Sequence, residues 1–201
     1  MKFEEMRLNL PNFLRRQKIP DILLRRDEKK IMHISDTPDN IYVFLLNLIE
    51  KTKPDYIIHT GDLVDNIKLE RRPELRERYE KSLIELLQIL ENSKAKVYIV
   101  PGNEDDVSIL RRHITLSKIV PPGTIIEIEG VKLAVGHKYS DVVGIENADF
   151  KLYGHSFRLI PKGVNGVLRI NFILLPSKRV VGVKYPDGTN FERGYRLMRG
   201  M

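Results

Sequence analysis

The sequence predicts an α/β fold in which two mixed sheets pack face to face with helices outside them, a four-layer α/β/β/α sandwich. Two observations carry this prediction. In the first half, short apolar runs alternate with amphipathic helical stretches. After the Pro-Pro-Gly sequence at 121–123, strand-like segments separated by turns replace the helices.

The first half is expected to form a parallel sheet. Strands are predicted at residues 31–35, 56–59 and 96–100. A helix follows Pro38, whose fixed φ suits a first helical turn, and a longer one begins near Pro73. Strands that alternate with helices in this way pair in parallel through right-handed crossovers.

The second half is expected to be antiparallel or mixed. Residues 125–128 and 131–135 flank Glu129-Gly130 and predict a hairpin. Further strands are predicted near 150–153, 167–174 and 179–184. Before residue 30, apolar residues interrupted by Pro11 and Pro20 predict short helical turns that pack on the body.

Composition limits the class of protein. The chain has 201 residues, 42% of them hydrophobic, and no linker-like tract, so we expect a single domain over 1–201. Cysteine is absent, which excludes disulfides and thiolate chemistry. No apolar run reaches the roughly 18 residues of a membrane span, and the N-terminus lacks a signal-peptide core, so a cytoplasmic location is expected.

The charge is concentrated at the N-terminus. The chain carries 34 basic and 27 acidic residues, a net charge of +7. Residues 1–30 hold nine bases and five acids, which makes +4 of that total. Such a segment favours anionic partners, including nucleic acid or another polyanion, although a solvated surface without aromatic stacking residues is the simpler interpretation.

Five short segments place a metal-binding side chain directly after an apolar run. Taken singly, each has an ordinary explanation, since an Asp before a helix is often an N-cap and a lone His is often structural. Their order changes that interpretation, because donors at successive strand ends meet at one edge of an α/β sheet. The segments are Ser35-Asp36-Thr37, Gly61-Asp62-Leu63-Val64-Asp65, Gly102-Asn103-Glu104-Asp105, Gly136-His137 and Gly154-His155-Ser156.

This ordered series resembles the motifs of the calcineurin-like metallophosphoesterases. The resemblance runs over residues 31–177, leaving 1–30 as a basic N-terminal extension and 178–201 as C-terminal strands. It implies two divalent metals bridged by one Asp, and attack of a metal-bound hydroxide on the phosphorus of a phosphate ester. The metal ligands that the resemblance implies are Asp36, Asp62, Asn103, His137 and His155, and the catalytic positions are Asp36 and Glu104.

Three positions depart from the family pattern. Pro38 and Phe157 stand where the family has metal-binding histidines, and Glu104 stands where it has a His that protonates the leaving group. By this analogy one metal site keeps all four ligands and the other is halved. Glu104, together with Asp105 or Asp39, is a candidate for rebuilding the second site, whereas Asp65 is interpreted as a loop-shaping residue.

Two functions follow from this pattern. The first is a metal-dependent phosphoesterase, chiefly a phosphodiesterase, with Mn²⁺ as the first candidate ion and Zn²⁺, Fe²⁺ or Ni²⁺ as others. The second is a catalytically degenerate member of the same fold that serves as a binding or scaffold module. The loss of two ligands at Pro38 and Phe157, together with the His replaced by Glu104, keeps this alternative open.

Overall fold

Two sheets form the centre of the computed structural model, which describes residues 18–195. The larger sheet has six strands in the order β10-β9-β1-β2-β3-β4. Strands β1 to β4 run parallel, β9 is antiparallel to β1, and β10 is antiparallel to β9, so this sheet is mixed. The strands are β1 (Lys29–Ile34), β2 (Tyr56–His59), β3 (Lys96–Ile99), β4 (Lys118–Ile119), β9 (Ile170–Leu175) and β10 (Val180–Val183).

The smaller sheet has four strands in the order β5-β6-β7-β8. The predicted hairpin is confirmed, with Glu129 and Gly130 at φ 51° and 76° in its turn. Strands β6, β7 and β8 pair in parallel, so this sheet is mixed as well. Its strands are β5 (Thr124–Ile128), β6 (Val131–Val135), β7 (Phe150–Tyr153) and β8 (Gly163–Asn165).

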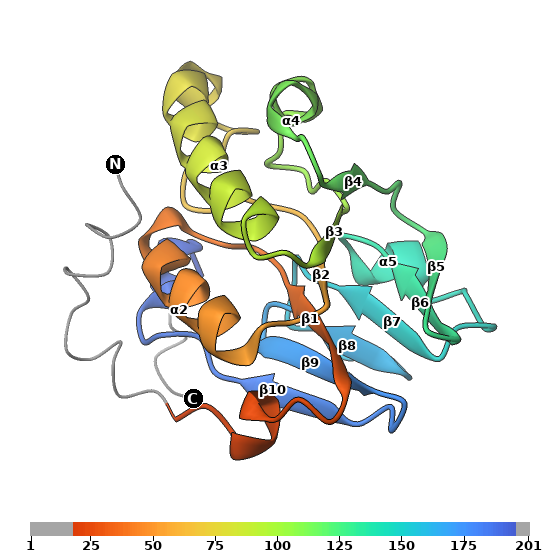
Figure 1. Cartoon of the computed structure of the whole chain (residues 1–201). Coiled ribbons are helices and arrows are strands. Elements are labelled where there is room, and N and C mark those ends of the chain that lie inside the picture. The colour runs from red at the N-terminus through yellow and green to blue at the C-terminus, as the bar shows by residue number, and fades with distance from the viewer. Residues whose placement is uncertain (1–17, 196–201) are drawn as a thin grey trace, which may run out of the picture.

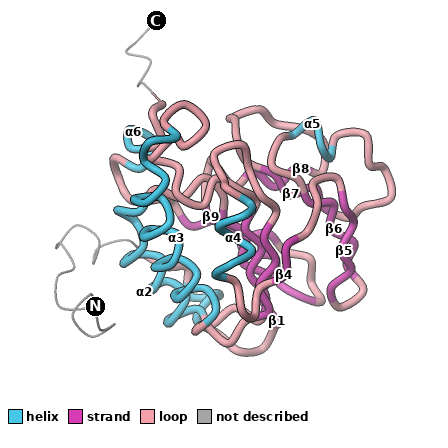
Figure 2. Tube along the Cα trace, turned by 90° about the horizontal axis from the view of Figure 1, so that it is seen from above, coloured by secondary structure: helices cyan, strands magenta, loops and turns pink. Residues whose placement is uncertain are grey.

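The helices lie outside the two sheets, which confirms the predicted α/β/β/α layering (Figures 1 and 2). Helices α2 (Tyr42–Thr52) and α3 (Arg76–Glu91) cover the outer face of the larger sheet. The short α5 (Tyr139–Val142) packs on the outer face of the smaller one. The remaining helical elements are η2 (Asp21–Leu24), η3 (Asp39–Ile41), η4 (Pro73–Leu75), α4 (Val107–His113) and α6 (Thr189–Glu192).

Alternation along the central strands divides the core into layers. In β1, Met32 points toward the helices, while Ile31 packs between the two sheets. In β2, Ile57 likewise points toward the helices, and Ile58 packs between the two sheets. This period of two fixes the register and hence the position of every strand end.

Two groups of elements differ from expectation. The strand predicted at 167–174 begins at Ile170, because the side chain of Asn165 accepts the Val167 N–H at 2.9 Å and forms a turn in place of sheet pairing. The elements β4, β8, α4, α5 and α6 are too short to show periodicity in the sequence. The predicted N-terminal turns are represented by η2, and residues 1–17 lie outside the described residues.

Among residues 18–195, no helix is both long enough and apolar enough to cross a membrane.

Candidate metal centre

Each predicted site residue follows a strand of one of the two sheets, as expected from the strand order. Asp36 follows β1, Asp62 follows β2 and Asn103 follows β3. His137 and His155 follow β6 and β7 in the other sheet. The loops are joined by backbone hydrogen bonds, with Asp36 N–H donating to Gly61 O at 2.9 Å and Gly154 N–H donating to His137 O at 2.8 Å.

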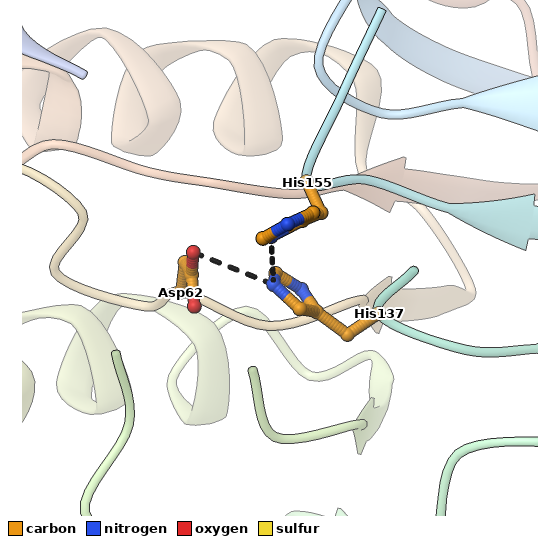
Figure 3. A group of neighbouring side chains, drawn as sticks. All are labelled: Asp62, His137 and His155. Atoms are coloured by element: carbon orange, nitrogen blue, oxygen red, sulfur yellow. Dashed lines mark hydrogen bonds and ion pairs between the residues drawn. The ribbon is translucent and has the colours of Figure 1, made fainter. Parts of the chain in front are cut away.

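His137 is the centre of the first group of donors, and Figure 3 draws it with two of the others, Asp62 and His155. Its Nδ1–H donates a hydrogen bond to the carbonyl of Thr60 at 2.7 Å. This bond directs Nε2 toward three other atoms that could coordinate a metal. These are Asn103 Oδ1 at 3.0 Å, His155 Nδ1 at 3.1 Å and Asp62 Oδ2 at 3.4 Å. The structure therefore brings together the four residues expected to hold one metal.

The spacing of these atoms suits a shared divalent ion. Ligand atoms bound at about 2.1 Å from one ion stand roughly 3.0–3.4 Å apart in octahedral or tetrahedral arrangements. The three separations from His137 Nε2 fall in this range. The bond from His137 Nδ1 to a carbonyl is also the outer contact that orients metal-binding histidines.

The pKa of His137 shows that the position where the four donors meet favours positive charge. Burial lowers the pKa of His137, but the hydrogen bond and the charge of Asp62 outweigh it and raise the pKa to about 9. Burial, reinforced by the charge of His137, lowers the pKa of His155. In the metal-free protein, a proton on His137 therefore compensates the negative charge of Asp62, which a metal ion would otherwise balance.

A second group contains three carboxylates. Asp36, Asp62 and Asp65 each offer an oxygen, and these atoms all lie within 4.8 Å of one another. All three side chains are buried. Asp65 was interpreted from the sequence as a loop-shaping residue, but the structure places it beside Asp36 and Asp62, with its Oδ2 lacking a hydrogen-bond partner. In the sequence, only the spacing of three residues from Asp62 to Asp65 indicates that the two carboxylates could meet.

The other candidates for rebuilding the second site face elsewhere. Asp39 pairs with Asn66 and Ser82. Both oxygens of Asp105 accept backbone N–H groups, including those of Asp62 and Leu63, at 2.8 and 2.9 Å. The suggestion that Asp39 or Asp105 rebuilds the second site is therefore wrong, because these carboxylates support the loops.

Glu104 is also engaged. Its Oε2 accepts the Glu70 N–H at 2.8 Å, and its own N–H donates to Asp62 Oδ1 at 3.0 Å. Burial raises the pKa of Glu104. The side chain therefore ties the 66–72 loop to the centre and does not project into solvent as an unpaired anion.

The sequence model of the calcineurin-like phosphoesterase family matches residues 29–176, which is 148 of the 201 residues. The chain belongs to this family. Because family members generally depend on divalent metals, the two donor groups are candidate metal-ligand sets of a phosphoesterase.

Three solved structures are similar to this chain, and the first of them supports the fold. One superposes with a TM-score of 0.55 and 11% identity, covering 79% of this chain and 99% of its own. YfcE, a phosphoesterase from E. coli, has a TM-score of 0.49 and 17% sequence identity, over 79% of this chain and 100% of its own. The protein of unknown function AQ665 from Aquifex aeolicus has a TM-score of 0.45 and 20% sequence identity, over 69% of this chain and 89% of its own. No curated protein sequence matches the chain significantly.

A C-terminal segment beyond the family match packs against the phosphoesterase site. Arg193 is 1% exposed, and its guanidinium donates to the carbonyls of Ser35, Asp36 and Val167. Tyr195 donates its hydroxyl to His155 O at 2.8 Å. Neither role could be predicted from the sequence, because an isolated Arg and Tyr outside a motif give no periodic signal.

The loops of this phosphoesterase site approach each other so closely that glycine is required. A Cβ on Gly154 would lie 1.9 Å from Ser35 Oγ and 2.3 Å from Asp36 Oδ2. We expect Gly154→Ala to lower the free energy of unfolding by roughly 1–3 kcal/mol in urea denaturation. Gly144→Ala, where nothing lies within 4 Å, is the control and should stay within about 0.5 kcal/mol of wild type. Equal effects of the two changes would contradict this tight packing.

Proposed function

We propose that the protein is a metal-dependent phosphodiesterase that holds one divalent ion, Mn²⁺ in the first place, with Asp62, Asn103, His137 and His155. The observation that carries the proposal is the convergence of Asp62, Asn103 and His155 on His137 Nε2 at 3.0–3.4 Å. Two imidazoles, one carboxylate and one amide oxygen suit Mn²⁺, Zn²⁺, Fe²⁺ or Ni²⁺. An ion bound there would polarise a phosphoryl oxygen and lower the pKa of water.

The protein's own groups hold these donors in place. Thr60 O fixes the His137 ring through Nδ1, and Glu70 fixes the Asn103 amide, whose Nδ2 donates to Glu70 Oε2 at 2.7 Å. This second bond leaves the amide oxygen of Asn103 facing His137. Asp36 Oδ2 accepts the Ser35 hydroxyl at 2.5 Å and the His155 N–H at 3.0 Å, so Asp36 orients the loop that carries His155.

The charge of the centre supports a diester as substrate. Three buried carboxylates surround it, and each further pair of like unit charges about 5 Å apart costs on the order of 3 kcal/mol at an effective dielectric of 20. A phosphodiester carries one negative charge, whereas a monoester carries close to two at neutral pH. These carboxylates therefore repel a diester less than a monoester wherever bound cations leave part of their charge uncompensated.

Hydrolysis of bis-p-nitrophenyl phosphate by protein purified without chelator and supplied with Mn²⁺ tests the proposal. We expect one tightly bound ion per chain by elemental analysis, and metal-dependent turnover that exceeds turnover of p-nitrophenyl phosphate. A folded, metal-loaded protein with no turnover on either ester would favour the scaffold alternative, which the missing donors at Pro38 and Phe157 support.

A further inference from the structure

The three carboxylates of Asp36, Asp62 and Asp65 require more positive charge than one metal site supplies. Their oxygens lie within 4.8 Å of one another, and the side chains are 1%, 3% and 1% exposed. Buried carboxylates at such distances are stable as anions only beside a compensating cation. Fully ionised, the three carboxylates carry −3, and one divalent ion at the proposed site supplies +2 against it. Burial raises the pKa of Asp36 and raises the pKa of Asp65 to about 7, so a further cation is needed to keep all three ionised at neutral pH.

Lys68 supplies an ammonium at this position. Its Nζ forms an ion pair with Asp65 Oδ1, while the other Asp65 oxygen is buried without a hydrogen-bond partner. The ammonium also lies close enough to Asp62 and Glu104 for its charge to favour their ionised forms. Lys68 therefore faces the carboxylate group and not the solvent alone.

The loop backbone holds Lys68 in this position. Lys68 adopts a left-handed conformation with φ 54°, and its carbonyl accepts N–H groups from Arg71 and Arg72, both at 3.0 Å. The preceding Ile67 is 1% exposed and anchors the turn in the core. The side chain of Lys68 is 29% exposed, so its stem passes from the surface toward the carboxylates.

The neighbouring buried cation is committed to other partners. The guanidinium of Arg193 donates to the carbonyls of Ser35, Asp36 and Val167, and to Asn190 Oδ1. It also stacks on the Tyr185 ring at 4.1 Å. Arg193 therefore holds the backbone, and its described hydrogen bonds include none to the carboxylates of the group.

We propose that the ammonium of Lys68 takes the second cation position of this centre, so that the protein uses one divalent ion and one lysine where two metals would otherwise bind. The proposal rests on the proposed function, because it presumes the first metal site. One divalent ion and one ammonium supply +3, which balances the three carboxylates. The bound ion and the Lys68 ammonium would then both supply positive charge for a phosphoryl group at this centre.

Removal of the ammonium should expose the carboxylates to a second ion. Full-length Lys68→Met protein, stripped of metal and titrated with Mn²⁺ in a calorimeter, should bind two ions per chain where wild type binds one. Methionine is unbranched and only one atom shorter than lysine, and it removes the charge. The double variant Lys68→Met/Asp65→Asn should return to one ion, because it loses a carboxylate of the second position.

Two controls separate charge from general disturbance of the loop. Lys68→Arg keeps the cation and should bind one ion. Lys94→Met changes an exposed lysine with the same left-handed backbone, φ 67°, and should also bind one ion. Circular dichroism of each variant confirms that it is folded.

The outcomes distinguish the inference from the proposed function. Two equally tight ions in wild type, or one ion in folded Lys68→Met, would overturn the role of Lys68 and leave the first metal site intact. No tight ion in wild type would refute the proposed metal centre itself, and the role of Lys68 with it.

Discussion

His137→Ala is expected to abolish tight binding of a divalent ion and to remove phosphoester hydrolysis. His137 Nε2 lies 3.0–3.4 Å from the other three donors, so its loss removes the atom on which the set converges. Loss of an outer partner of a metal ligand already costs about 10- to 100-fold in affinity, so loss of a ligand should cost at least about 100-fold. Titration calorimetry with Mn²⁺ measures the change.

His155→Ala gives the same test with less disturbance of the fold. The His155 backbone N–H donates to Asp36 and the His155 carbonyl accepts from Tyr195, so alanine retains both hydrogen bonds. The control is His113→Ala, which removes a histidine paired with Glu80 on the helical side of the protein. If His155→Ala or His137→Ala bound Mn²⁺ as tightly as His113→Ala, the four-residue site would be wrong.

The convergence of the candidate metal ligands could be predicted because its signal is carried by strand order. Each donor follows an apolar strand, and parallel strands place their ends at a common edge, so Asp62, His137 and His155 had to converge once the fold was known. The close packing also required glycine before each of the three, at Gly61, Gly136 and Gly154, which the sequence displays.

The role of Asp65 could not be predicted in the same way. Whether its carboxylate meets Asp36 depends on the turn after β2, where Asp62 adopts φ 55°, and no sequence pattern specifies that conformation. Lys68 presents the same difficulty, since its ion pair requires a left-handed backbone at a residue other than glycine. Arg193 lies outside the motifs, and only the tertiary structure brings it to the carbonyls of Ser35 and Asp36.

The affinity for Mn²⁺ is expected to rise about 100-fold between pH 6.5 and pH 8.5. Burial lowers the pKa of His137, but Asp62 outweighs it and holds the pKa at about 9 in the metal-free protein, so His137 is protonated at neutral pH. An ion must displace this proton, because a metal ligand must be neutral imidazole. Proton competition weakens binding tenfold for each pH unit below the pKa, so affinity rises with pH and levels off near pH 9.

The second histidine should not add to this slope at neutral pH. Burial, followed by the charge of His137, lowers the pKa of His155 below its usual 6.5, so this imidazole is neutral across the range. Calorimetry in buffers of different ionisation enthalpy should count close to one proton released per ion at pH 7. A flat affinity between pH 6.5 and 8.5, or release of no proton, would mean that the ion does not bind His137 Nε2. Asp62→Asn in the metal-free protein provides an independent check, because removal of the charge that raises the pKa of His137 should bring its titration by proton NMR back below pH 7.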